Sequence, residues 1–431
     1  MTGQHLVLCD GPGGDPRAFR SAYAHYLANC CHEFMALGTD LPPALRGAHE
    51  RVADLVRRAL SVDEGRLLHC FASPSVGTPL RCLRLRDDLP QFRARIDDAG
   101  ASLIPHLLLE MALGGLLGDS DNVAWEHGAP RLASLALGGE IAPPDGATGL
   151  VFSATSVSAI AAGARIAQLP LDAEGMRAAL ARAEGFRFER RCHEIGDVTL
   201  FALIDHNPIA AFETHPDKSG NPVDLGGRPE AEWVDSLEMA FGLVETFLPQ
   251  TFAEMRMMLH AVIPVGYDET RHLSASYREG IGTMYLTLHP HVMTMAEAVV
   301  HEFQHNKFNV AADSAQYVEN AFHPLYKSPI RPDPRPLWGI LLAVHAFLPV
   351  AELYRRMRDA GHPLAARPDF ETRMSEIDLK NHEGMEMLRA HARFTDAGVA
   401  LFGDLETLER RHLADRSARG LSNVPTEVHV A

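Results

Sequence analysis

Apolar residues recur every three to four positions over long parts of the chain, which is the spacing of one face of an α-helix. One such pattern runs from Phe19 to Phe34, directly after the helix-start pair Asp15-Pro16. A second runs from Leu45 to Ala59, and a third apolar segment spans Leu103 to Leu117. We therefore predict that about the first 120 residues are mainly helical.

The pattern changes in the middle of the chain, where short β-rich runs are separated by turn residues. Leu150-Val151-Phe152 indicates a strand, and the turn pair Gly196-Asp197 lies between Phe186–Glu189 and Val198–Ile204, which predicts a hairpin. Loop-forming residues then dominate from 214 to 227. We place a domain boundary there, with one domain at 1–215 and a second at 216–431.

The second half returns to helices after a β-rich stretch. A helix is predicted at Pro229–Leu248, strands within Met255–Val265 and Gly282–Leu288, and later helices that include Leu337–Arg358 and Phe370–Phe394. The predicted fold class is α+β and helix-dominated, with a helical N-terminal portion and a small β section.

The sequence from His301 to His305 reads H-E-x-x-H. On a helix, residues four apart project from one face, so the imidazoles of His301 and His305 can bind one metal ion. Thr294 and Glu297 form a capping-box pattern, which predicts that this helix starts at Thr294. We therefore expect a C-terminal metal domain with a zincin-like H-E-x-x-H helix.

A catalytic site needs a third ligand, and three downstream residues are candidates: Glu319, His345 and Glu352. His345 is the only polar side chain in the apolar run 337–348, and we favour it over the alternative of a core histidine bonded to backbone. A carboxylate from Glu319 or Glu352 would instead fit a zinc peptidase.

A proline-rich loop at 327–336 carries two arginines four residues apart, Arg331 and Arg335. On a stiff segment, two guanidinium groups can make planar, bidentate contacts with a carboxylate ligand. An equally good interpretation is a surface loop whose arginines pair with acidic neighbours.

Composition and charge restrict the partners and the cellular compartment that we expect for this protein. Lys plus Arg number 40 against 56 Asp plus Glu, a formal charge of −16 that disfavours nucleic acid and anionic membrane surfaces as partners. No uninterrupted apolar run suggests a membrane span, and residues 1–10 lack the features of a secretion signal, so we expect a cytoplasmic protein. The six cysteines show no metal-binding spacing and are predicted to be reduced.

Three blocks of sequence, taken in order, resemble a known family. They are 298–307 around the H-E-x-x-H motif, 331–337 with its alternating arginines and prolines, and 345–350, beginning His345-Ala346-Phe347. This chain is similar here to the α-ketoglutarate-dependent H-E-x-x-H peptide β-hydroxylases of bacterial peptide-modification systems. The resemblance covers about residues 255 to 360 and leaves the N-terminal half unassigned.

The resemblance implies a non-haem iron dioxygenase. Fe(II) would be held by His301, His305 and a third protein ligand, leaving open positions for cosubstrate and O2. α-Ketoglutarate would chelate the iron, and Arg331 or Arg335 would take its distal carboxylate. The product would be a β-hydroxylated residue in a ribosomally synthesised precursor peptide.

Two other classes of function stay open. A zinc-dependent metallopeptidase would use Glu302 as general base on metal-bound water, whereas in the oxygenase Glu302 would support the ligands. A non-catalytic peptide-binding protein with a structural metal is the third alternative. In each case the N-terminal portion could hold a leader peptide, and Ser274 and Ser276 could line a peptide groove along a strand edge.

Overall fold

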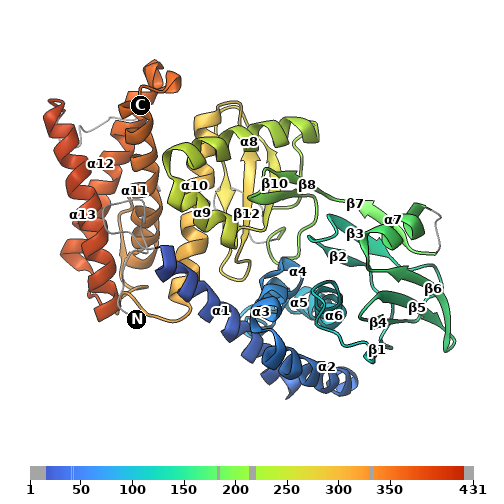
Figure 1. Cartoon of the computed structure of the whole chain (residues 1–431). Helices are drawn as coiled ribbons and strands as arrows, with labels where there is room; N and C mark the ends of the chain where they lie inside the picture. Colours follow the sequence, from blue (N-terminus) through green and yellow to red (C-terminus); the bar gives the residue numbers. More distant parts are fainter. Residues whose placement is uncertain are drawn as a thin grey trace.

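A computed structural model describes residues 16–39, 41, 43–181, 185–212, 220–329 and 333–421. The fold is α+β and rich in helices, with several small sheets, as the sequence predicts (Figure 1). The predicted domain boundary between residues 215 and 216 lies outside the described residues.

The first part of the described chain is helical, in agreement with the prediction. In α2, the apolar positions of the sequence pattern, from Leu45 to Ala59, are the buried ones. The elements of this part are α1 (Pro16–Ala36), η1 (Leu37–Thr39), α2 (Pro43–Val62), α3 (Glu64–Ala72), α4 (Pro74–Arg84), η2 (Pro90–Phe92), α5 (Arg93–Ala101) and α6 (Leu103–Leu113).

Two small antiparallel sheets follow. A four-stranded sheet has the order β1-β4-β5-β6, and a three-stranded sheet has the order β2-β3-β7. The predicted strand at 150–152 lies within β4. The elements are β1 (Asn122–Trp125), β2 (Leu132–Ser134), β3 (Gly139–Ala142), β4 (Gly149–Ser153), β5 (Ser156–Ala161), β6 (Ala164–Pro170), α7 (Ala173–Ala181) and β7 (Arg187–Arg190).

The hairpin around Gly196-Asp197 exists, but its predicted first strand is wrong. The turn joins β8 (Cys192–Ile195) to β9 (Thr199–Ala202), with Ile195 opposite Thr199. A tight turn pairs the residues next to it, and Phe186–Glu189 lies too far upstream to take that position. The β7 strand pairs with β3 in the other sheet instead.

A mixed five-stranded sheet supports the second half, with the order β11-β12-β10-β9-β8. The central strand β10 (Ala261–Tyr267) is parallel to β9 and to β12 (Thr283–Leu288), while β11 (Ser274–Ala275) is antiparallel to β12 at the edge. The stretch Met255–Val265 contains the predicted strand, since β10 begins at Ala261, but its first residues, 255–258, end helix α9 (Pro249–Met258), which follows α8 (Glu230–Phe247). Pro249 occupies the first turn of α9, where its missing N–H is tolerated.

Four long helices make up most of the rest of the chain, and Figure 1 shows α10 between the five-stranded sheet and the group α11–α13. The helix α10 begins at Val292, two residues before the predicted start, and its N-terminus has no side-chain cap. The elements are α10 (Val292–Ala312), β13 (Leu325–Tyr326), β14 (Arg335–Pro336), α11 (Leu337–Asp359), η3 (Pro363–Ala366), α12 (Pro368–His391) and α13 (Asp396–Ala418).

One hydrophobic core includes residues from both predicted domains. Phe19 of α1 packs edge-on against Phe303 of α10, with ring centroids 6.4 Å apart. Arg81 of α4 forms an ion pair with Asp313, at 2.7 Å, just beyond the end of α10. The N-terminal helices therefore pack directly on the helix that carries the H-E-x-x-H motif.

Among the described residues, α11 alone is long and apolar enough to cross a membrane, but 72% of its most apolar window is buried inside the protein. Such burial is typical of a core helix. The described cysteines are buried and unpaired, as predicted, and Cys9 lies outside the described residues; the free thiols are Cys30, Cys31, Cys70, Cys82 and Cys192.

Candidate metal centre

The three motif residues lie together on α10. The imidazole rings of His301 and His305 have centroids 4.4 Å apart, and both side chains are partly exposed although most of their neighbours on the helix are buried. Glu302 is buried, with its Oε1 3.9 Å from Nε2 of His301. The helix thus presents two imidazoles and one carboxylate in the pattern that the sequence predicts.

Asn306 fixes the motif to the edge of the sheet. Its Oδ1 accepts a hydrogen bond from the backbone N–H of Gly282 at 2.8 Å, and its Nδ2 lies within hydrogen-bond distance of Ser276 Oγ and Thr283 O. Ser276 in turn donates to the backbone carbonyl of Glu302 at 3.1 Å. These buried bonds hold the second turn of the motif against β11 and β12, because leaving any of them unmade would cost free energy.

Gly282, which Asn306 contacts, also packs closely against the backbone of Met258 and the ring of His260. Its φ is +83°, and a Cβ there would lie 2.7 Å from the carbonyl oxygen of Met258 and 2.5 Å from the ring of His260. Any other residue would meet both the backbone strain and the clash.

A buried ion pair holds the other face of α10. Lys307 Nζ lies 2.7 Å from Glu254 Oε2 of α9, and both side chains are almost inaccessible to solvent. The same ammonium lies 5.3 Å from the centre of the Phe19 ring. Breaking such a pair would leave an unpaired buried charge, so it fixes the orientation of α10.

The electrostatics of the site favour neutral imidazoles. Burial lowers the pKa of His301 well below its ordinary value, and the nearby His305, His272 and Arg373 lower it further. Burial also lowers the pKa of His305, although Glu302 opposes that shift. Neutral imidazole is the form that binds a metal.

Several polar atoms of the motif have no hydrogen-bond partner among the described residues. They are Nδ1 of His301, Nδ1 of His305 and Oε2 of Glu302, all buried. Buried polar groups are normally paired, and unpaired ones cluster at functional sites. The donor set and its unsatisfied atoms fit two ligand positions for a metal that takes imidazole nitrogen.

A cavity of about 430 Å³ opens beside His301. Its walls come from residues 270–274, from the junction of β12 and α10 at 289–294, from α10 and α11, and from residues 364–373. Phe347 of α11 lies against His301, with ring centroids 4.5 Å apart. This volume lies near the lower end of the range of about 300–1,000 Å³ that is typical of small-molecule sites.

The third ligand is not in place in the structure. Among the described residues, no group of three histidine, cysteine, aspartate or glutamate side chains is arranged to hold a metal ion. His345 is fully buried on α11 and packs on Phe308, with ring centroids 4.9 Å apart. His345 as third ligand therefore stays a prediction.

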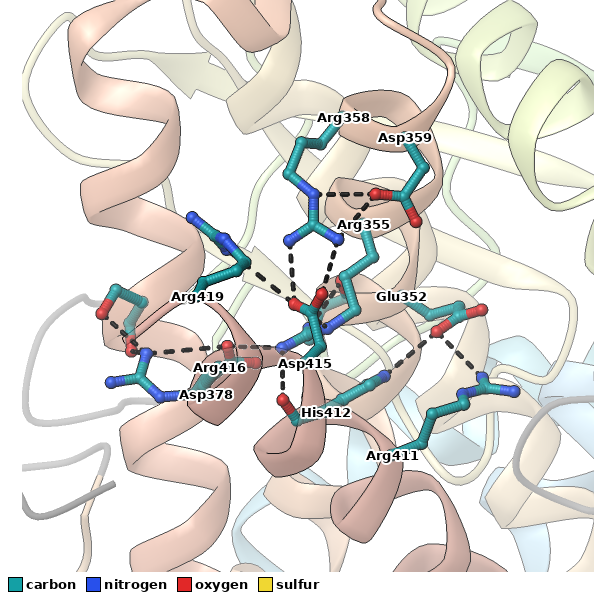
Figure 2. A network of polar contacts seen from close by, with 12 residues as sticks. Glu352, Arg355, Arg358, Asp359, Asp378, Arg411, His412, Asp415, Arg416 and Arg419 are labelled. Carbon is teal, nitrogen blue, oxygen red and sulfur yellow. Dashed lines mark hydrogen bonds and ion pairs between the residues drawn. The ribbon is translucent and has the colours of Figure 1, made fainter. Parts of the chain in front are cut away.

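The two carboxylate candidates make contacts elsewhere. Glu319 is exposed and pairs with Arg393. Figure 2 shows Glu352 held by Arg411 and His412, in a polar network on another face of α11. Neither residue lines the cavity.

The arginine loop is only partly described. Arg331 lies outside the described residues, while Arg335 belongs to β14 and its Nε lies 2.8 Å from a carboxylate oxygen of Asp333. Arg335 is not among the residues that line the cavity. The pairing with an acidic neighbour is the alternative that the sequence left open.

Sequence reasoning missed several residues of the cavity wall. Glu297 of α10, interpreted from sequence as a helix cap, accepts hydrogen bonds from Tyr354 and Arg373, and His272 also lines the cavity. The spacing of Glu297 and His301, four residues apart on one helix, could have placed them on one face. No local pattern indicates Arg373, because it reaches the site through the packing of α12.

No model of a known protein family matches this sequence, and a comparison with curated proteins found no match.

Proposed function

We propose that this protein is an Fe(II)- and α-ketoglutarate-dependent dioxygenase that β-hydroxylates a residue of a ribosomally synthesised precursor peptide in the bacterial cytoplasm. The observation that carries the proposal is the pair His301 and His305 on a rigidly anchored helix, beside a cavity of about 430 Å³. The order of the three sequence blocks, including 331–337, favours this family over ordinary zinc peptidases.

The protein's own residues would then have defined tasks. His301 and His305 hold the metal, and a third ligand, for which we propose His345, completes the set. Glu302 orients the ligands through its carboxylate, and the Phe347 ring shields His301 from water. Iron with α-ketoglutarate and O2 supplies hydrogen-atom abstraction and hydroxylation, with succinate and carbon dioxide as coproducts.

The peptide substrate has a candidate binding edge. Strand β11 lies at the edge of the five-stranded sheet, and Ser274 lines the cavity. An extended peptide can add to such an edge through main-chain hydrogen bonds. We propose that the precursor peptide binds along β11, with the residue to be modified entering the cavity.

A zinc-dependent metallopeptidase is the second candidate, and one observation favours it. Glu302 has a carboxylate oxygen with no hydrogen-bond partner among the residues that the structure describes, and it lies next to His301, which is the position of a general base for metal-bound water. The same strand edge would serve a peptidase. Zinc would then replace Fe(II), and α-ketoglutarate would have no role.

The test is an anaerobic titration of α-ketoglutarate into Fe(II)-loaded protein. A chelated 2-oxo acid gives a visible metal-to-ligand charge-transfer band, which we expect in the natural protein and not in the His301→Ala variant. His25→Ala, at an exposed position on α1, is the matched control and should retain the band. Absence of the band, together with zinc retained through purification and cleavage of a peptide, would support the peptidase instead.

A further inference from the structure

The cavity differs in charge from the rest of the molecule. The whole chain carries a formal charge of −16, yet the cavity is lined by two arginines and four histidines against two carboxylates, Glu297 and Asp369. The two guanidinium groups are balanced by these carboxylates, so a metal cation bound at His301 would leave the cavity positive. Such a cavity favours an anionic ligand.

Arg373 is the cationic side chain best prepared to receive that ligand. Its Nε and Nη2 donate to both carboxylate oxygens of Glu297 at 2.8–3.2 Å, and Tyr354 donates its hydroxyl to the same carboxylate. The guanidinium is therefore held in one orientation before any ligand arrives. Its third nitrogen, Nη1, makes only a 3.5 Å contact with Glu376, whose side chain is exposed.

Arg373 also lies near the candidate metal ligands. Both Arg373 and His301 line the same cavity. A five-carbon dicarboxylate that chelates a metal at one end must place its other carboxylate within the same small volume. The Arg373 guanidinium lies on the wall of that volume, and its Nη1, at 3.5 Å from the exposed Glu376, can turn to bind this carboxylate directly.

Arg335, the described arginine of the proline-rich loop, lies at the other end of α10. Trp338, three residues after Arg335, packs on Phe308, with ring centroids 5.2 Å apart. Phe308 is seven residues beyond His301, which is about 10 Å along a helix. The cavity lies on the other side of His301, towards Glu297 and the N-terminus of α10.

We propose that Arg373, held by Glu297 and Tyr354, is the carboxylate-binding residue of the cavity and takes the distal carboxylate of α-ketoglutarate. The identity of the ligand rests on the proposed function, whereas the carboxylate subsite rests on the geometry of the cavity. The assignment replaces Arg335 in this role, while Arg331 lies outside the described residues.

The experiment compares two 2-oxo acids on anaerobic, Fe(II)-loaded protein. α-Ketoglutarate carries the distal carboxylate, and 2-oxovalerate has a methyl group in its place. Arg373→Gln should raise the dissociation constant of α-ketoglutarate about 100-fold, because it removes one partner of a charged pair. The dissociation constant of 2-oxovalerate should change by less than about threefold. The dissociation constants come from the charge-transfer band, and the 2-oxovalerate band reports that the variant is folded and holds iron.

Arg335→Gln is the matched control and should bind both acids like the natural protein. Equal weakening of both acids by Arg373→Gln would overturn the subsite, because the arginine would then act only on the structure of the site. If Arg335→Gln weakened the binding of α-ketoglutarate but not of 2-oxovalerate, Arg335 would be the residue that binds the distal carboxylate.

A second measurement separates the subsite from the proposed function. Calorimetry of succinate binding to Zn(II)-loaded protein needs neither iron nor turnover, and it keeps the metal charge that leaves the cavity positive. We expect binding that Arg373→Gln abolishes and Arg335→Gln retains, even if no charge-transfer band forms with any 2-oxo acid. No succinate binding by the natural protein in this measurement would overturn the subsite.

Discussion

Two faces of α11 each contact a cluster of charged residues. The two clusters contain similar residue types but differ in their surroundings. On one face, Tyr354 reaches Glu297 and Arg373 at the wall of the cavity. On another, Glu352 and Arg355 enter a network that joins α11 to α12 and α13 (Figure 2). Both clusters pair arginine with a buried glutamate, Glu297 in one and Glu352 in the other.

The difference lies in what surrounds the charges. In the network, Arg355 pairs with Asp378 at 2.6 Å, and Glu352 is contacted by Arg356, Arg411 and His412. The cavity cluster borders open volume and imidazoles whose Nδ1 atoms have no hydrogen-bond partner in the described part of the chain. Burial of charge therefore does not by itself mark a functional site. Open volume next to the candidate metal ligands is what distinguishes the cavity cluster.

The comparison predicts that breaking the network affects stability and not metal binding. Arg355→Ala would leave Asp378 buried without its closest cation, so we expect a loss of about 3–5 kcal/mol in the free energy of unfolding. Chemical denaturation measures this loss, and metal analysis of the folded fraction should show unchanged content. Arg393→Ala, which removes an exposed pair with Glu319, should cost less than about 1 kcal/mol. A similar loss in both variants would contradict the distinction.

The second prediction concerns acid stability. Burial tends to raise the pKa of Glu352, but the hydrogen bond from His412 and the charge of Arg411 outweigh it, and the pKa falls to about 2. A carboxylate with a depressed folded-state pKa stabilises the protein above its unfolded-state pKa, and this contribution is lost as pH falls through the folded value.

Glu352→Gln should therefore be less stable than the natural protein at pH 7 by about 1–3 kcal/mol, with the difference shrinking between about pH 4.5 and pH 2. Denaturant unfolding at a series of pH values measures the difference. Glu386→Gln, at an exposed position on α12, provides the control. A difference that stays constant down to pH 2 would show that the Glu352 carboxylate is not stabilised by its charge.

The smallest effect is expected at the cavity's other arginine. Arg367 is largely exposed and pairs with Asp369 two residues away, so its charge is screened by water. Arg367→Gln should change the α-ketoglutarate dissociation constant by less than about threefold and leave the melting temperature unchanged. A loss comparable with that of Arg373→Gln would mean that overall cavity charge, rather than one preorganised guanidinium, binds the ligand.

The sequence predicted the helices and contacts that depend only on residues close together along the chain. The helical N-terminal part, α8 and α11 follow from apolar periodicity, and the pairing of His301 with His305 follows from helix geometry. In the β-rich stretch predicted at Met255–Val265, the strand begins only at Ala261, because the methionine-rich apolar run before it fits a buried helix as well as a strand.

The rest of the site depends on contacts between distant segments. Glu297 matches a helix cap by spacing, but tertiary partners on α11 and α12 use its carboxylate instead. Arg373 has no motif, since only the packing of α12 brings it to the cavity. Nor could spacing show that Phe347, two residues after His345, is the side chain that lies against His301.

The bonds of Asn306 to Gly282 and Ser276 have a consequence for substrate selection. They tie the residues next to β11 and β12 to the motif helix, which sets the spacing between β11 and His301. If a precursor peptide binds along β11, as proposed, the distance from the bound segment to the cavity would then be constant. The position modified would be set by its count of residues from the gripped segment, as well as by the chemistry of its side chain.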